Sequence, residues 1–158
     1  MSEYVDGPAQ EQLLQAWLDM SLMIRGNRLI TGFSLNEMVI CRILYERREQ
    51  GGEAVTATEL CRRMQLLKSQ INKILTTMEK DGTIERVRSE SDRRKIEIHL
   101  REEGLRRYVD EHERILQIIG HVRSRLGAAQ ADQLTRLMNE TVKAVREMPA
   151  AESPMEKE

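Results

Sequence analysis

The chain has 158 residues, enough for one domain with a buried core, and its net charge is −1. That charge would by itself argue against a nucleic-acid-binding protein, but it is unevenly distributed. Residues 62–95 hold ten Lys or Arg against five Asp or Glu, a net +5, which leaves −6 for the rest of the chain. No stretch is long and apolar enough to span a membrane, so we expect no membrane partner.

Helical periodicity dominates the N-terminal half. The first predicted helix covers roughly residues 10–28, and Gly32 ends its pattern. Ser34–Glu37 then forms a capping box, in which the Ser and Glu side chains bond free amides at the start of a second helix. This helix is apolar on nearly every side between Met38 and Tyr45, so we expect it at the centre of the fold.

Two short helices are predicted after a solvated turn, ERREQGGEA. Thr56–Glu59 is a second capping box and opens a helix that runs through Met64. After a brief polar turn, residues 67–81 place apolar side chains at i, i+3, i+4 and i+7, and Gly82 is positioned to end this helix. Two short helices joined by a few residues are typical of a helix-turn-helix.

A hairpin and two long helices complete the predicted elements. Strands are expected at 84–88 and 95–100, because apolar and polar residues alternate strictly in the second, and residues 89–95 form the hairpin tip. Helices follow at 102–126 and around 134–145. They offer more apolar surface than one small lobe can use, which suggests packing against a second copy of the chain.

The exposed face of the 67–81 helix and the hairpin tip carry side chains that suit DNA. Asn and Gln can bond adenine edges, Lys can reach guanine or phosphate, and Ser and Thr hydroxyls suit phosphates. A solvated amphipathic helix would look similar, but the equally basic turn just downstream makes the combination more specific for nucleic acid. The predicted DNA-binding residues are Lys68, Ser69, Gln70, Asn72, Lys73, Thr76, Arg86, Arg88, Asp92, Arg93, Arg94 and Lys95.

Specific sequence motifs extend this pattern over residues 32–104. They are Glu59-Leu60, the run MEKDGTIER at 78–86, and Asp92-Arg93-Arg94 followed by Leu100 and Gly104. In these motifs and their spacing, the segment resembles the winged helix-turn-helix core of the MarR (multiple antibiotic resistance regulator) family. Three positions depart from the family pattern, namely Leu67, Glu90 and Arg101.

The resemblance implies a fold that is mainly α with a small β-hairpin wing. A winged helix-turn-helix lobe at 32–101 would be flanked by N- and C-terminal dimerisation helices at 1–31 and 102–148, within a single domain. Residues 149–158 would form a flexible tail.

The resemblance also implies a function. The chain would be a homodimer that binds a pseudo-palindromic double-stranded DNA operator, most often as a repressor released by a ligand or by thiol oxidation. The 67–81 helix would enter the major groove and the 89–95 wing the minor groove, where a narrow groove attracts arginine. Arg94 would be the arginine at the wing tip, oriented by the Asp92 carboxylate, although plain turn chemistry also explains an Asp there. Phosphate contact or bracing of the wing would fall to Arg86, Arg88, Arg93 and Lys95.

Arg42 suggests how a small molecule could switch the chain. It shares a helix face with Met38, and an arginine on an apolar stripe must be paired. One interpretation is an ion pair with Glu46, one turn further on. The other is that Arg42 binds an aromatic or carboxylate-bearing effector in a pocket lined by Trp17, Ile24 and Met38.

Other functions find less support. Cys41 and Cys61 lie in apolar helical patterns, as expected of buried residues in a reduced, cytoplasmic protein rather than of oxidant sensors. We expect no metal and no cofactor, because the histidines lack a paired spacing. We expect no enzyme either, since phosphate-loop and nucleophile motifs are missing from the sequence. The alternative is a winged-helix module whose basic face binds an acidic protein partner.

Overall fold

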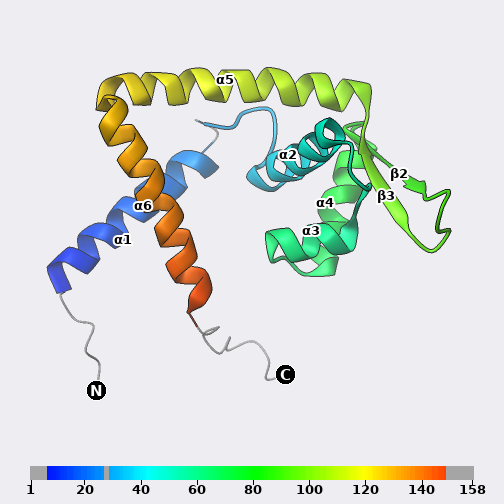
Figure 1. Cartoon of the computed structure of the whole chain (residues 1–158), viewed down its shortest axis with the longest axis horizontal. Coiled ribbons are helices and arrows are strands. Elements are labelled where there is room, and N and C mark those ends of the chain that lie inside the picture. The colour runs from blue at the N-terminus through cyan, green and yellow to red at the C-terminus, as the bar shows by residue number, and fades with distance from the viewer. Residues whose placement is uncertain (1–6, 27–28, 149–158) are drawn as a thin grey trace. The chain divides into compact units, whose positions relative to one another are not determined.

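The computed structural model describes residues 7–26 and 29–148 (Figure 1). The chain divides into two compact units, one ending at Ile115 and one beginning at Leu116. Helices dominate and the strands form one small sheet, so the predicted fold class is confirmed. In the described part of the chain the elements are α1 (Gly7–Arg25), α2 (Leu35–Gln50), β1 (Val55–Thr56), α3 (Ala57–Met64), α4 (Lys68–Lys80), β2 (Ile84–Arg88), β3 (Ile96–Leu100), α5 (Glu102–Leu126) and α6 (Ala128–Glu147).

The first helix differs from its prediction at both ends. α1 begins at Gly7 rather than near residue 10, and it ends at Arg25, with the amide of Gly26 donating to the Leu22 carbonyl (2.8 Å). Residues 27 and 28, which the prediction included, and the predicted tail at 149–158 lie outside the described residues. None of the residues of α1 is buried, and its apolar side chains are exposed except for Ile24, which is half-buried.

The predicted capping box at the start of α2 is confirmed. Ser34 Oγ accepts from the Glu37 amide (3.3 Å), and Glu37 Oε2 accepts from the Ser34 amide (2.7 Å). The prediction of a turn from Glu46 is wrong, because α2 continues to Gln50. Its last turns consist of polar residues that favour helix. Gly51 then caps the helix in the left-handed conformation, with a φ of 65°, which glycine adopts readily.

The sheet contains one strand more than the sequence predicts. Its strand order is β1-β3-β2, and Val55 of β1 pairs with Ile98 of β3. β1 has only two residues, too few to show an alternating pattern. β2 has the predicted bounds, and β3 starts at Ile96 rather than Lys95. The hairpin register places Arg86 opposite Ile98 and Arg88 opposite Ile96, so these four residues share one face of the sheet.

The predicted helix-turn-helix is formed by α3 and α4. Thr56 Oγ1 accepts from the Glu59 amide (3.3 Å) as expected, but the Glu59 carboxylate accepts from Arg47 Nη2 instead of completing a capping box. α4 lies within one residue of its prediction at each end. It ends at Lys80, and the predicted terminator Gly82 follows the cap residue Asp81 with a φ of 79°, its amide donating to the Glu79 carbonyl (3.2 Å).

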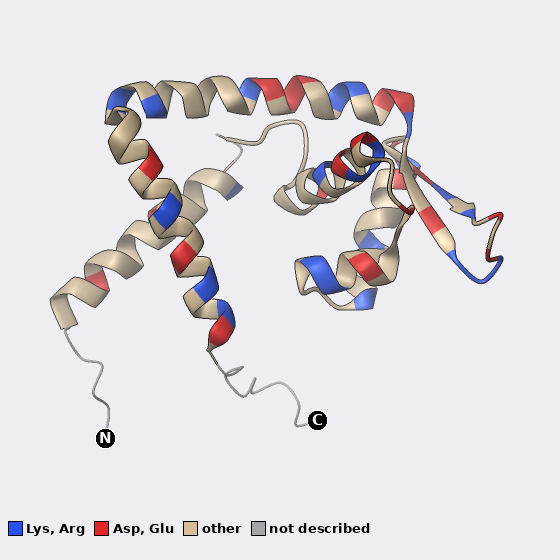
Figure 2. Ribbon diagram, viewed as in Figure 1, with Lys and Arg blue, Asp and Glu red and all other residues tan. Residues whose placement is uncertain are grey.

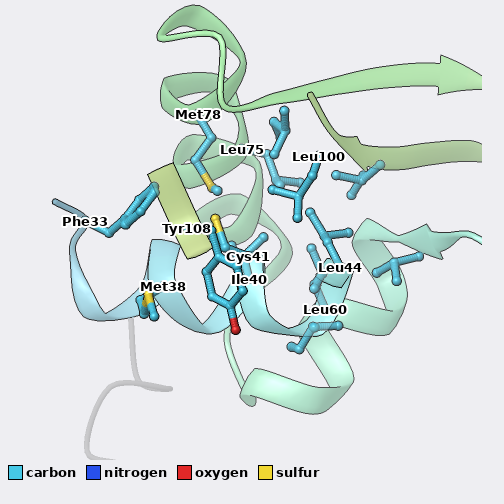
Figure 3. Packing of buried hydrophobic residues seen from close by; sticks show 14 of the residues in the cluster. Phe33, Met38, Ile40, Cys41, Leu44, Leu60, Leu75, Met78, Leu100 and Tyr108 are labelled. Atoms are coloured by element: carbon cyan, nitrogen blue, oxygen red, sulfur yellow. The ribbon is translucent and has the colours of Figure 1, made fainter. Parts of the chain in front are cut away.

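One buried cluster in the first unit holds these elements together (Figure 3). It includes Ile40 and Cys41 of α2, Leu75 and Met78 of α4, and Tyr108 of α5, each at most 2 % exposed. Burying a side chain of this size contributes about 1.5–3 kcal/mol. The central position predicted for α2 is confirmed, and burial of one face of α4 leaves its polar face open to solvent.

Glu111 of α5 binds the loop that leads into α2. Its carboxylate accepts from the Thr31 amide (2.6 Å) and from Arg114 Nε (3.0 Å), while Arg114 Nη2 also donates to the Leu29 carbonyl. The hydrogen bonds from Arg114, aided by the loop amides, lower the pKa of the buried Glu111 carboxyl from 4.5 to about 2. The ionised carboxylate therefore ties the loop to α5 at neutral pH.

We expect Glu111→Gln to lower the free energy of unfolding by about 3 kcal/mol at pH 7. A carboxyl whose pKa is lowered by folding stabilises the protein fully above its unfolded pKa of 4.5, and this contribution is lost as pH falls towards about 2. Urea unfolding of both proteins from pH 7 to pH 2.5 measures the difference. The difference in the free energy of unfolding between the two proteins should become smaller below pH 4.5. A difference that does not change with pH would contradict the stabilising role of the ionised Glu111 carboxylate.

The second unit contains the end of α5 and all of α6, joined by an ion pair between Arg123 and Asp132 (2.7 Å). Many large apolar side chains in this unit are exposed, each by more than a third. They are Leu116, Ile119, Val122, Leu126, Leu134, Leu137, Met138, Val142 and Val145. Within residues 7–26 and 29–148, no helix is long and apolar enough to cross a membrane.

Candidate nucleic-acid interface

The polar face of α4 is open, because the opposite face is buried in the core by Ile71, Leu75 and Met78. Of the residues predicted to contact DNA on this helix, only Asn72 is half-buried. The exposed ones are Lys68, Ser69, Gln70, Lys73 and Thr76. Within the described residues Lys68 and Lys73 form no ion pair, so both ammonium groups remain available to an anion.

Two of the side chains of α4 that were predicted to contact DNA already form hydrogen bonds within the helix itself. Gln70 Oε1 accepts from the Leu67 amide (2.9 Å) and so caps a helix start at which the Leu side chain cannot accept. Thr76 Oγ1 donates to the Asn72 carbonyl (2.8 Å), a bond that also limits its rotation. Gln70 would have to exchange this bond to offer its oxygen to a base edge, and Thr76 would have to exchange its bond to donate to a phosphate.

Arg86 of β2 braces α4 against the hairpin. Its Nη2 donates to Thr76 Oγ1 (3.1 Å) and to the Asn72 carbonyl (3.4 Å), and its Nε lies 3.6 Å from Glu79 Oε2. The sequence left phosphate contact and bracing open for Arg86. These contacts are those of a bracing residue, and phosphate contact stays a prediction. One guanidinium thereby links β2 to α4.

The wing turn between β2 and β3 is closed by its own backbone and by Asp92. The Ser89 amide donates to the Lys95 carbonyl (3.0 Å), and the Lys95 amide donates to the Asp92 carbonyl (2.8 Å). Asp92 Oδ1 accepts from the backbone amide of Arg94 (3.0 Å). Turn chemistry, the simpler of the two interpretations of Asp92, is therefore confirmed.

The arginines at the wing turn form no ion pair with a described residue. Arg88, Arg93 and Arg94 are exposed, and none of the three forms an ion pair with a residue that the structure describes. Figure 2 shows Lys and Arg beside acidic residues at the turn between β2 and β3, and further Lys and Arg on α3 and α4 of the same unit. Exposed, unpaired cations on a helix and an adjoining hairpin form a surface suited to a polyanion.

Sequence reasoning missed one residue of this surface. Alternation predicts that Ile96, Ile98 and Leu100 all seat the hairpin on the core, and the last two are buried. Ile96 is 51 % exposed instead, because β3 extends past the edge of the core at that point. The only signal in the sequence is its position directly beside the basic turn.

The residues predicted to bind an effector are spread over different environments. Met38 is buried, Ile24 packs partly against the core, and Trp17 is 44 % exposed. The Arg42 side chain is 68 % exposed and its Nε donates to Glu46 Oε1 (2.7 Å), so the predicted ion pair is confirmed. The effector site itself stays a prediction.

Cys41 has the properties of a core residue. It is fully buried, and burial raises the pKa of its thiol to about 12, so almost no reactive thiolate forms at neutral pH. Cys61 is half-buried and packs against the same cluster. The prediction that Cys41 is a small buried apolar residue is confirmed.

A helix-turn-helix with a cationic hairpin beside its second helix defines the winged-helix class, the architecture of many DNA-binding regulators. Residues 41–95 match the sequence profile of the MarR family. Over these residues the chain is similar to the MarR family, and its fold is that of a winged-helix protein. A search of curated proteins found no significant match to the sequence.

Solved structures of transcriptional regulators share the fold over most of their length. A mutant of S. aureus MepR is 12 % identical with a TM-score of 0.68, and the alignment covers 86 % of this chain and 97 % of MepR. BldR from Sulfolobus solfataricus is 17 % identical with a TM-score of 0.66, over 91 % and 99 % of the two chains. PcaV from Streptomyces coelicolor, solved with its natural ligand, is 17 % identical with a TM-score of 0.67, over 92 % and 98 %.

Proposed function

We propose that the chain is a homodimeric transcriptional repressor that binds pseudo-palindromic operator DNA and is released by a small-molecule effector. α4 occupies the major groove and the wing, residues 89–95, enters the adjacent minor groove. The observation that carries this proposal is the shared cationic surface of α4 and the wing, where lysines and arginines are exposed and unpaired among the described residues. Such a surface attracts phosphates and leaves Arg94 free to enter a narrow minor groove.

The exposed apolar helices support dimerisation. α6 exposes Leu134, Leu137, Met138, Val142 and Val145, which follow helical spacing along one face. A face of this kind is stabilised by burial against another protein surface. A second copy of the chain supplies an identical face, and two-fold symmetry then gives two recognition helices roughly 34–36 Å apart or a multiple of that spacing.

The proposal is tested by selecting duplexes from a random pool with the full-length chain. We expect the enriched sequences to contain an inverted repeat, and we expect two chains per duplex by sedimentation analysis. If no sequence is enriched over the others in the pool, the proposal is contradicted. That result would favour a winged-helix module that binds an acidic protein.

Arg42 is the residue we propose for effector binding, in a site with Trp17, Ile24 and Met38. Its guanidinium is exposed and held by a single carboxylate, so a phenolate or carboxylate ligand can replace Glu46 as its partner. PcaV, which shares the fold, has been solved with a natural ligand, which supports a ligand-responsive mechanism here.

We expect Arg42→Met to remove effector response without weakening DNA binding. An exposed ion pair contributes little to stability, so affinity for the selected duplex should stay within about twofold of wild type. The measurement is release of the labelled duplex by a panel of benzoates and phenols. Arg48→Met, which removes another exposed arginine of α2, is the control. Normal release of the Arg42→Met complex would rule out this site.

A further inference from the structure

Leucine occupies the cap position of α4, where a side chain that accepts a hydrogen bond would stabilise the helix. Leu67 has the extended backbone of a cap residue, and its side chain forms no hydrogen bond. It lies outside the buried cluster of the first unit and is 70 % exposed, more than any other large apolar residue that the structure describes. Leu67 therefore contributes neither to the cap nor to the core.

Gln70 replaces the missing cap and keeps a hydrogen-bond donor free. Its Oε1 accepts from the Leu67 amide (2.9 Å), and its Nε2 bonds no residue that the structure describes. The orientation of this side-chain amide follows from chemistry, because a backbone N–H can bond the oxygen but not the NH₂ group. The start of α4 therefore carries an exposed donor close to an exposed apolar side chain, three residues apart along the chain.

We infer that Leu67 and Gln70 together recognise a thymine in each half of the operator. This inference rests on the proposed function and adds which base is read and by which residues. In the major groove, thymine presents an acceptor, O4, next to its C5-methyl group. Gln70 Nε2 donates to O4, and the Leu67 side chain covers the methyl group. The first residues of a recognition helix are those that reach base edges, which places this pair at the bases.

The other three bases match this pair less well. Cytosine presents its N4 donor where thymine has O4, so two donors would face each other. Adenine is read by a glutamine through both its oxygen and its nitrogen, and the oxygen of Gln70 is already bonded to the Leu67 amide. Guanine accepts through O6 and N7 but has no methyl group for Leu67 to cover. Thymine alone satisfies both the donor and the apolar side chain.

Three variants separate the two contacts. Leu67→Ala removes the apolar contact and keeps the backbone amide to which Gln70 is bonded. Leu35→Ala is its matched control, because it removes another exposed leucine from the start of a helix, α2. Gln70→Glu keeps the cap, since a carboxylate oxygen also accepts from the Leu67 amide, but it replaces the free donor with an acceptor. An acceptor at this place matches N4 of cytosine instead of O4 of thymine.

The test uses the full chain and a duplex that it enriches from a random pool. Each thymine is replaced in both half-sites, first by uracil, which lacks the methyl group, and then by 5-methylcytosine with guanine opposite, which keeps the methyl group and carries N4 in place of O4. At one thymine of the half-site, we expect uracil to lower wild-type affinity by about tenfold and 5-methylcytosine by about 100-fold.

The variants should change this discrimination in different ways. Leu67→Ala should bind the thymine and uracil duplexes within about twofold of each other, whereas Leu35→Ala should keep the difference of about tenfold. Gln70→Glu should bind the 5-methylcytosine duplex more tightly than the thymine duplex. Because the measurement is a ratio of two affinities, a uniform loss of binding caused by the added charge does not alter it. Urea unfolding confirms that the variants are folded.

The outcomes separate thymine recognition from the proposed function. If the wild type enriches a sequence but no thymine in it responds to uracil, thymine recognition is wrong and the proposed function stands. It is equally wrong if folded Leu67→Ala and Leu35→Ala discriminate alike against uracil, or if Gln70→Glu still prefers thymine. If the wild type enriches no sequence at all, the proposed function fails and thymine recognition fails with it.

Discussion

The Arg94→Ala variant is expected to bind its operator about 10- to 100-fold more weakly than the wild type, which corresponds to roughly 1–3 kcal/mol. The Arg94 guanidinium is exposed at the wing turn, and it bonds no described residue that would have to release it. Its backbone amide, not its side chain, is held by Asp92 (3.0 Å). Removing the Arg94 side chain should therefore remove a contact with DNA and leave the wing turn intact.

Fluorescence anisotropy at fixed salt measures this effect, with thermal unfolding as the check on folding. Arg106→Ala is the matched control, because it removes one exposed arginine of α5 that pairs only with Glu103 (2.7 Å) among the described residues. We expect the control to bind within about twofold of wild type, since an exposed pair contributes little. If Arg94→Ala and Arg106→Ala bind equally well, the wing tip does not contact DNA.

Gly104→Ala is expected to have the largest effect on stability, a loss of about 4 kcal/mol or more in the free energy of unfolding. A Cβ at Gly104 would overlap the Thr83 carbonyl oxygen and lie 2.7 Å from its carbonyl carbon. That carbonyl also accepts from the Arg101 amide (3.0 Å), and the Thr83 amide donates to the Met78 carbonyl (2.9 Å). The backbone there is held on both sides, so it cannot move away from the added carbon.

Gly120→Ala is the control, because Gly120 lies on the same helix. Apart from the backbone of that helix and the neighbours of Gly120 in the chain, no described atom lies within 4 Å of the position that an alanine methyl group would take. Alanine is the better helix former by about 1 kcal/mol, so the control should unfold at an equal or higher urea concentration. Urea unfolding at one protein concentration compares the three proteins. A Gly104→Ala protein as stable as wild type would show that α5 does not pack on Thr83.

Local patterns were sufficient to predict the elements that form the interface. The spacing of Ile71, Leu75 and Met78 predicts α4 to within one residue, because a helix that buries one face needs apolar residues at that period. Strict alternation likewise predicts the hairpin. Gly104 belongs to the motif that carries the family resemblance, and its contact with Thr83 gives that glycine a physical reason.

Contacts between distant residues left no local signal. Glu111 and Thr31 are separated by 80 residues, and nothing near Glu111 in the sequence distinguishes it from the other acids of α5. Arg86 of β2 donates to Thr76 of α4, a contact that forms only once both elements are in place. β1 is too short to show a period, and the exposure of Ile96 depends on where the core ends rather than on alternation.

The central claim is that α4 and the wing together read an operator. The most direct measurement is the affinity of the full-length chain for its selected duplex and for a scrambled duplex of equal length, between about 50 and 200 mM salt. We expect log K to fall with log salt at about −0.9 per phosphate contact for both, with the selected duplex bound at least about 10³-fold more tightly throughout. Equal affinity for the two duplexes at every salt concentration would contradict the account.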